Sequence, residues 1–214
     1  MYKQFFNFID VPFKKDISVD DFYMSSNLKE TISRFEFLKQ HRGFMLLTGE
    51  SGSGKTAAIR YLFETINKSY FHTIYLQFST VSTIEFYRQL NLALGGGYIH
   101  KKSDLFASIQ HIILDLSINK KRIPIIVLDE AQFLKNKIFY EIQLLLNFNI
   151  DSIDPAIFII VGQKYIYHIL ERPAYSPLFD RINIFFNIPF FSKSETIEYI
   201  KHRLIIAGCK KDIF

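Results

Sequence analysis

Short apolar runs and helical stripes alternate along this chain. Continuous apolar runs at 124–128 and 156–161 predict buried strands of the kind that helices cover on both faces, and the segments 44–47 and 182–188 predict two more strands. The segment 71–78 alternates and is rich in β-branched and aromatic residues, which predicts a further strand. Elsewhere, apolar residues recur every three or four positions and predict helices over 28–40, 59–66, 83–94, 105–116 and 138–146. Strands that alternate with helices predict a mostly parallel sheet.

The expected elements carry recognisable end signals. Ser26 or Asn27 is placed to cap the first helix, and Gly43 opens the first strand. The helix over 83–94 stops at three consecutive glycines, 95–97. No internal repeat or low-complexity linker interrupts the order. We expect one α/β domain with a small appendage, because 214 residues cannot hold two full domains.

A last helix is predicted near the C-terminus. Ser192 and Glu195 fit a capping box at its start, and Gly208 stops it. Its expected apolar face consists of Ile197, Ile200 and Leu204. The aromatic-rich segment 1–25 is expected to pack against the core, or to wall an adenine ring.

The run at 44–47 leads directly into a glycine-rich loop and then into a helical pattern. The loop, Gly49-Glu50-Ser51-Gly52-Ser53-Gly54-Lys55-Thr56, fits G-x-x-x-x-G-K-[ST], the Walker A pattern. Its glycines let successive backbone N–H groups point at an anion, and the helix N-terminus adds partial positive charge. The pattern predicts binding of ATP: Lys55 reaches the β- and γ-phosphates, and the Thr56 hydroxyl ligates Mg²⁺. The alternative, a glycine- and serine-rich surface turn, fits the flanking strand and helix poorly.

The run that ends at Leu128 is followed by two acids, which is the Walker B pattern. A buried strand that ends in an acid places a carboxylate where ligands bind in open α/β sheets. We expect Asp129 to hold Mg²⁺, directly or through water, and Glu130 to orient and deprotonate the attacking water. A helix N-cap acid would give the same local pattern, but the phosphate loop favours a nucleotide site.

Two polar residues further along could complete a hydrolytic site. Gln163 follows a buried strand, so its amide could lie beside Glu130 and help to position water. Arg181 precedes the last strand, where an oligomer could project its guanidinium into a neighbouring site, and Arg172 competes for this role. The alternatives are a solvated loop glutamine and a surface arginine paired with Asp180.

Composition limits which cellular compartment and which binding partners we expect. The single cysteine, Cys209, excludes an internal disulfide and a Cys/His zinc cluster, so we expect a cytoplasmic protein. No apolar run approaches the roughly 18 residues of a membrane span, and no signal-peptide pattern opens the chain. The net charge of +5 allows an anionic partner without requiring one.

The order of motifs resembles the ExeA-like group of AAA+ ATPases. That group takes in, or lies close to, the transposition ATPases of the TniB, TnsC, MuB and IstB type. The resemblance covers nearly the whole chain and rests on MYKQFF…PF, FMLLTGESGSGKT, IVLDEAQFL, IQLLLNF, IIVGQKY and ETIEYIKHRLIIAG. It implies a five-stranded parallel sheet with the phosphate loop after the central strand, a helical lid, and assembly into rings or filaments. It also implies that Gln163 is the sensor 1 residue and Arg181 the arginine finger.

The resemblance implies three parts of the chain and one departure. We expect an N-terminal segment that packs on the ATPase core (1–43), the AAA+ core (44–190) and the start of a helical lid (191–214). The lid is truncated to one helix, and the glycine-proline-arginine stretch that carries a sensor 2 arginine in relatives is missing. Hydrolysis by this chain is therefore expected to be weak.

Three functions follow from the resemblance. The first is a homo-oligomeric regulator that assembles on DNA with ATP and acts on a transposase. The second is an ExeA-like secretion ATPase, and the third is a nucleotide-dependent scaffold with little turnover. For the first, Lys101 and Lys102 are the expected DNA contacts, whereas Lys120-Lys121-Arg122 is expected to be a solvated turn.

Overall fold

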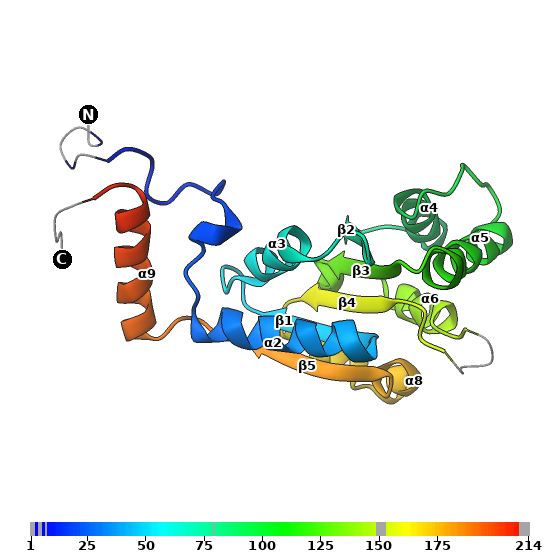
Figure 1. Cartoon of the computed structure of the whole chain (residues 1–214). Helices are drawn as coiled ribbons and strands as arrows, with labels where there is room; N and C mark the ends of the chain where they lie inside the picture. Colours follow the sequence, from blue (N-terminus) through cyan, green and yellow to red (C-terminus); the bar gives the residue numbers. More distant parts are fainter. Residues whose placement is uncertain (1–2, 4–5, 7, 79, 149–152, 210–214) are drawn as a thin grey trace.

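The computed structural model describes residues 3, 6, 8–78, 80–148 and 153–209. At its centre is a five-stranded parallel sheet with the strand order β2-β3-β4-β1-β5. The strands are β1 (Gly43–Gly49), β2 (Phe71–Gln77), β3 (Ile123–Asp129), β4 (Ile157–Gly162) and β5 (Ile182–Ile188). The expected parallel sheet between helices is confirmed (Figure 1).

The strand before the phosphate loop is not the central one. β4 is central, and β1 lies between β4 and the edge strand β5. The expectation of a phosphate loop after the central strand is therefore wrong. Both neighbours of β1 are nevertheless parallel to it, so the carboxyl ends of β1, β3 and β4 meet at one edge of the sheet.

Helices cover both faces of the sheet (Figure 1). One face packs against α2 (Ser26–His41) and α3 (Lys55–Thr65). The other packs against α4 (Thr83–Ala93), α5 (Lys102–Leu114), α6 (Asn136–Leu145), α7 (Tyr165–Leu170) and α8 (Ser176–Phe179). Short helical turns also occur at η1 (Val19–Asp21), η2 (Asp115–Asn119), η3 (Ala131–Phe133) and η4 (Pro173–Tyr175).

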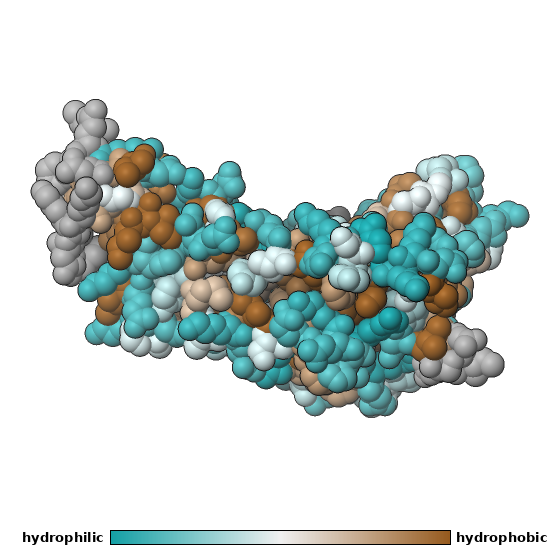
Figure 2. Space-filling model, viewed as in Figure 1, coloured by the Kyte–Doolittle hydropathy of each residue, from teal (hydrophilic) through white to brown (hydrophobic). Residues whose placement is uncertain are grey.

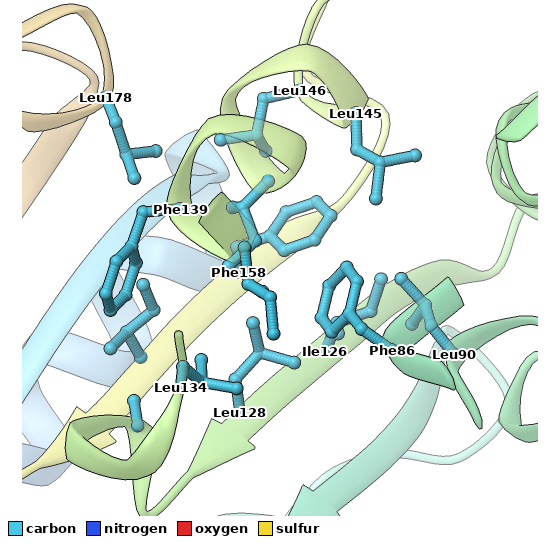
Figure 3. Packing of buried hydrophobic residues seen from close by; sticks show 14 of the residues in the cluster. Phe86, Leu90, Ile126, Leu128, Leu134, Phe139, Leu145, Leu146, Phe158 and Leu178 are labelled. Carbon is cyan, nitrogen blue, oxygen red and sulfur yellow. The ribbon is translucent and has the colours of Figure 1, made fainter. Parts of the chain in front are cut away.

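Successive strand residues alternate between two apolar cores, because side chains of a strand point to opposite faces. Leu46 of β1 lies in the core beneath α4 to α8, and Leu47 lies in the core beneath α2 and α3. In Figure 3, side chains from α4 and α6 converge on Ile126 of β3 and Phe158 of β4. These four strand residues are at most 2% exposed, so both faces exclude water.

The cap of α2 differs from the expected one. Ser25 has an extended backbone and its side chain accepts a backbone N–H in the first turn, so Ser25 is the cap rather than Ser26 or Asn27. The Ser26 hydroxyl instead donates to Glu195, and the Asn27 amide donates to the carbonyl of Pro189. Both side chains therefore connect α2 to the chain around α9 (Lys193–Ile206).

Residues 8–24, which we call the N-terminal strap, lie beside α9 at one end of the molecule (Figure 1). Two arginines from different elements donate to its backbone. The accepting carbonyls belong, in chain order, to Pro12, Lys14, Lys15 and Ile17. Arg203 of α9 holds the first two, both at 2.7 Å, and Arg60 of α3 holds the last two. The strap thus connects α9 to the helix that starts at the phosphate loop.

The buried face of α9 is not the expected apolar one. The capping box at Ser192 is present, and Gly208 follows the helix with φ at 88°, as expected. However, Ile197 is 45% exposed and Arg203 is 5% exposed, because Arg203 faces the strap. Apolar groups consequently remain on the surface of this end (Figure 2). Residues 210–214 of the expected lid, and residues 1–2, 4–5 and 7, lie outside the described residues.

Candidate functional site

The glycine-rich loop joins β1 directly to α3. Gly52 and Gly54 have φ values of 82° and 102°, a region that side chains with a Cβ rarely adopt. Gly49 is required for a different reason: a Cβ there would lie 2.4 Å from Ser53 Oγ and 2.8 Å from the carbonyl oxygen of Ile188. The loop conformation therefore depends on glycine at all three positions.

Lys55 closes over this loop. Its Nζ donates to the carbonyl oxygens of Gly49 at 2.8 Å and Glu50 at 2.9 Å. These bonds hold the ammonium at the first turn of α3, beside the N–H groups that the helix leaves unpaired. Phosphate oxygens entering the loop would therefore meet both the ammonium and the positive end of the helix.

Residues from both motifs line one cavity of about 270 Å³. Lys55 and Thr56 line it from α3, Glu130 lines it from the end of β3, and Gln163 lines it from the end of β4. The remaining lining residues come from the phosphate loop and from Ala57. Two segments about 75 residues apart in the sequence are thus brought together, as the carboxyl edge of a parallel sheet requires.

Asp129, the residue before Glu130, does not line this cavity and is 2% exposed. Its Oδ1 accepts the backbone N–H of Glu130 at 2.7 Å, and its Oδ2 accepts the hydroxyl of Tyr75 at 2.6 Å. Burial and this hydrogen bond raise the pKa of Tyr75 well above its usual range. Tyr75 therefore stays protonated and keeps donating to the carboxylate.

Thr56 and Asp129 are the side chains that could hold Mg²⁺. Within the described residues, no group of three or more His, Cys, Asp and Glu side chains is close enough to bind a metal on its own. Such a sparse set fits Mg²⁺, which commonly uses one or two protein ligands together with water and substrate phosphates. A hydroxyl and one buried carboxylate are consistent with that pattern.

Gln132, from the turn after β3, was not singled out by the sequence. Its Nε2 donates to Glu130 Oε2, and its Oε1 accepts the backbone N–H of Gln163 at 3.2 Å. Tyr75 was missed as well. Its place in an alternating strand is visible in the sequence, but its contact with Asp129 depends on β2 lying beside β3, which the sequence pattern did not reveal.

The structure does not bring Arg181 to the cavity of its own chain. Arg181 immediately precedes β5, at the edge of the sheet opposite the phosphate loop. Its Nη1 donates to the carbonyl of Leu146 at 3.1 Å, and it lines a separate cavity of about 290 Å³. Arg172, the competing arginine, is exposed before η4.

The two expected DNA contacts have different surroundings. Lys101 is exposed at the start of α5, in the connection that follows α4. Lys102 is paired with Glu141 of α6 at 2.5 Å and lies over the ring of Tyr87. In the other basic cluster, Lys120 pairs with Asp115 at 2.9 Å.

A further cavity, of about 670 Å³, adjoins the phosphate loop. Its walls come from the strap, α3 and α9, and they include Phe22, Tyr199 and Arg203 as well as Gly52 and Gly54. The strap therefore faces space beside the loop in addition to packing on α3 and α9.

We also find, in the described part of the chain, no helix with the length and apolar character that a bilayer crossing requires.

A parallel sheet whose phosphate loop and acidic strand end share one cavity defines a P-loop nucleoside triphosphatase fold. The family described as AAA domain matches residues 38–170. The chain belongs to this family.

The chain is also similar, in sequence or in fold, to known proteins. The chain is 28% identical over 222 residues to general secretion pathway protein A of Aeromonas hydrophila, covering all of this chain and 39% of that protein. The fold is similar to ORC2 of Aeropyrum pernix (TM-score 0.70, 13% identity, 93% of this chain, 56% of that one). It is also similar to Cdc6p of Pyrobaculum aerophilum, with a TM-score of 0.65 and 16% identity over 89% of this chain and 54% of that one. The chain thus spans about two-fifths of its secretion relative and about half of these structures.

Proposed function

We propose that this chain is a secretion ATPase similar to general secretion pathway protein A, that it hydrolyses ATP with Mg²⁺, and that it works as a homo-oligomer. The observation that carries the proposal is the single cavity lined by Lys55, Thr56, Glu130 and Gln163. The similarity to general secretion pathway protein A favours the secretion function over transposase regulation. The expected closeness to transposition ATPases, and a transposase partner, have no support among the relatives described above.

The residues of the cavity divide the work of hydrolysis. The backbone N–H groups of the phosphate loop and Lys55 bind and orient the phosphates. Bound Mg²⁺, held by Thr56 and Asp129, would add positive charge to the β- and γ-phosphates. Glu130 accepts a proton from the attacking water, and the Gln163 amide fixes the position of that water. Each of these side chains acts from a strand end or a helix start, so the site is built on rigid elements.

Two substitutions test binding and chemistry separately. Lys55→Ala should lower ATP affinity by roughly 2–3 kcal/mol, because a phosphate loses a charge-assisted partner. Glu130→Gln should keep ATP affinity but lower turnover by about 10²-fold or more. Calorimetry and a phosphate-release assay measure the two effects, with Lys39→Ala on α2 as a control. Equal ATP affinity in Lys55→Ala, or no turnover in the wild type, would contradict the corresponding half of the proposal.

We propose Arg181 as the residue that reaches a neighbouring subunit. Its position at the sheet edge away from its own cavity is what a contribution in trans requires. Arg181→Ala and Glu130→Gln should each have low turnover, and mixing them should restore part of it, because each supplies what the other lacks. If Arg172→Ala rather than Arg181→Ala complements Glu130→Gln, Arg172 holds this role.

Contact with duplex DNA through Lys101 and Lys102 is a further part of the proposal. Lys101 is exposed, whereas a phosphate would have to replace Glu141 as the partner of Lys102. Changing both to Ala should flatten the salt dependence of binding, by a slope of about 0.9 per lost phosphate contact. An unchanged affinity and slope would exclude this connection as the DNA contact.

A further inference from the structure

Gln132 connects Glu130 and Gln163, two residues that line the cavity from the ends of β3 and β4. It belongs to η3, the short turn that follows Glu130, and its side chain is half-buried. One end of its amide donates to the carboxylate of Glu130, and the other end accepts the backbone N–H of Gln163 at 3.2 Å. Because Nε2 and Oε1 are both used, the amide is fixed in one orientation.

The neighbouring backbone leaves room for this arrangement. A Cβ at Gly162, the last residue of β4, would lie 2.9 Å from Gln132 Oε1 and 3.1 Å from Ile166 Cδ1. Any larger residue would therefore push the glutamine away from the end of β4. Glu130 also has a left-handed backbone, with φ at 55°, which is uncommon for a residue with a Cβ. The glycine at position 162 and the left-handed backbone of Glu130 thus both occur beside the contact that Gln132 makes.

We propose that Gln132 is a positioning residue that ties the Glu130 carboxylate to the Gln163 backbone. Gln132 does not line the cavity of about 270 Å³, so it acts through Glu130 rather than on the substrate. The bond to Oε2 fixes the direction of the carboxylate and leaves Oε1 to accept from water. When the Gln163 side chain binds the attacking water, any shift of its peptide N–H reaches Glu130 through one side chain. This role rests on the proposed hydrolysis, but the link itself can be measured without turnover.

Amide hydrogen exchange at Gln163 tests the link directly. Gln132→Ala removes the acceptor, so the Gln163 N–H should exchange faster than in the wild type. Gln132→Glu keeps an acceptor oxygen of the same size and reach, so protection of the Gln163 N–H should remain. Unchanged protection in Gln132→Ala would overturn the proposal whatever the turnover is.

Turnover kinetics test what the link does. Gln132→Ala should lower kcat about 10-fold, as loss of an outer partner commonly does, while KM for ATP stays unchanged. Gln132→Glu should be at least as impaired at neutral pH, because it replaces a donor to Glu130 with a second negative charge. As the pH falls, the introduced carboxyl group becomes protonated and can donate again. Its kcat relative to the wild type should then recover, whereas that of Gln132→Ala should not.

Gln110 supplies a matched control. It is a half-buried glutamine on α5 whose Nε2 donates to the carbonyl of Asn147, away from the cavity. Gln110→Ala and Gln110→Glu should leave kcat, its pH profile and Gln163 exchange unchanged. A raised KM without a change in kcat in the Gln132 variants, or equal pH profiles for Ala and Glu at that position, would overturn the positioning role. A wild type without turnover would overturn the proposed hydrolysis, and exchange at Gln163 would still decide the link.

Discussion

The inner strands β1, β3 and β4 are buried at every position except the first residue of β1 and of β3, whereas α9 buries one residue of its fourteen, Arg203. In the sheet, every residue of β4 is buried, and the helices on both faces contribute apolar side chains to the two cores. At the α9 end, the contacts are arginine to carbonyl, tyrosine to carboxylate and ring to ring. The first region is held by exclusion of water, and the second by a few directional polar bonds. The sheet and the α9 end should therefore respond differently to substitution and to pH.

The largest expected effect is in the apolar core that packs against the sheet. Phe139→Ala should cost about 3–5 kcal/mol of unfolding free energy, because this α6 side chain is 1% exposed and leaves a cavity. Ile197→Ala on α9 should change stability by less than about 0.5 kcal/mol, since that side chain is 45% exposed. Urea unfolding followed by circular dichroism measures both. Similar losses for the two variants would erase the distinction between the regions.

A smaller and more local effect is expected at the strap. Arg203→Met removes the donors to Pro12 and Lys14, so opening of the strap should become easier by about 1–3 kcal/mol. Amide exchange and limited proteolysis should report this over 8–24, with little change in the exchange of the sheet. Lys201→Met, on the exposed side of α9, is the control. If Arg203→Met destabilises the sheet equally, the α9 end is not a separate region.

The smallest effect is a pH dependence at the α9 end. The Tyr23 hydroxyl donates to Glu198 at 2.6 Å, and this bond, together with burial, raises the pKa of Tyr23 to about 12 from 10.0. A raised pKa means that the contact stabilises the fold below pH 10 and is lost as pH rises through 12. An ultraviolet titration of the wild type minus Tyr23→Phe should show one phenol ionising near pH 12. A difference centred near 10 would show that the bond is absent in solution.

The same contrast explains how far the sequence could predict the structure. The first and last residues of β5 and the start of α4 were predicted from the pattern of apolar residues, because local periodicity reports which face of an element is buried. The phosphate loop and the acids at 129–130 followed from the chemistry of phosphate and metal binding. Both kinds of signal are local in the sequence.

The contacts that the sequence missed depend on the fold. Tyr75 reaches Asp129 only because β2 lies beside β3, and Gln132 reaches Gln163 only because β4 is the next strand. The buried face of α9 was mispredicted because an arginine, rather than an isoleucine, meets the strap there. Rules based on periodicity assume that apolar residues face inward. They therefore predict the wrong buried face for a helix that is anchored by a guanidinium group.

The strap has one consequence for how this region can vary. Arg60 and Arg203 bind peptide oxygens, which every amino acid carries, and they contact four carbonyls within six residues. These four contacts are therefore specified by two arginines more than 140 positions apart. They depend little on the side chains of the segment that the arginines bind. A chain built this way can change the exposed side chains at 13–16, and so part of the wall that they give to the neighbouring cavity, while the contacts of the four carbonyls stay the same.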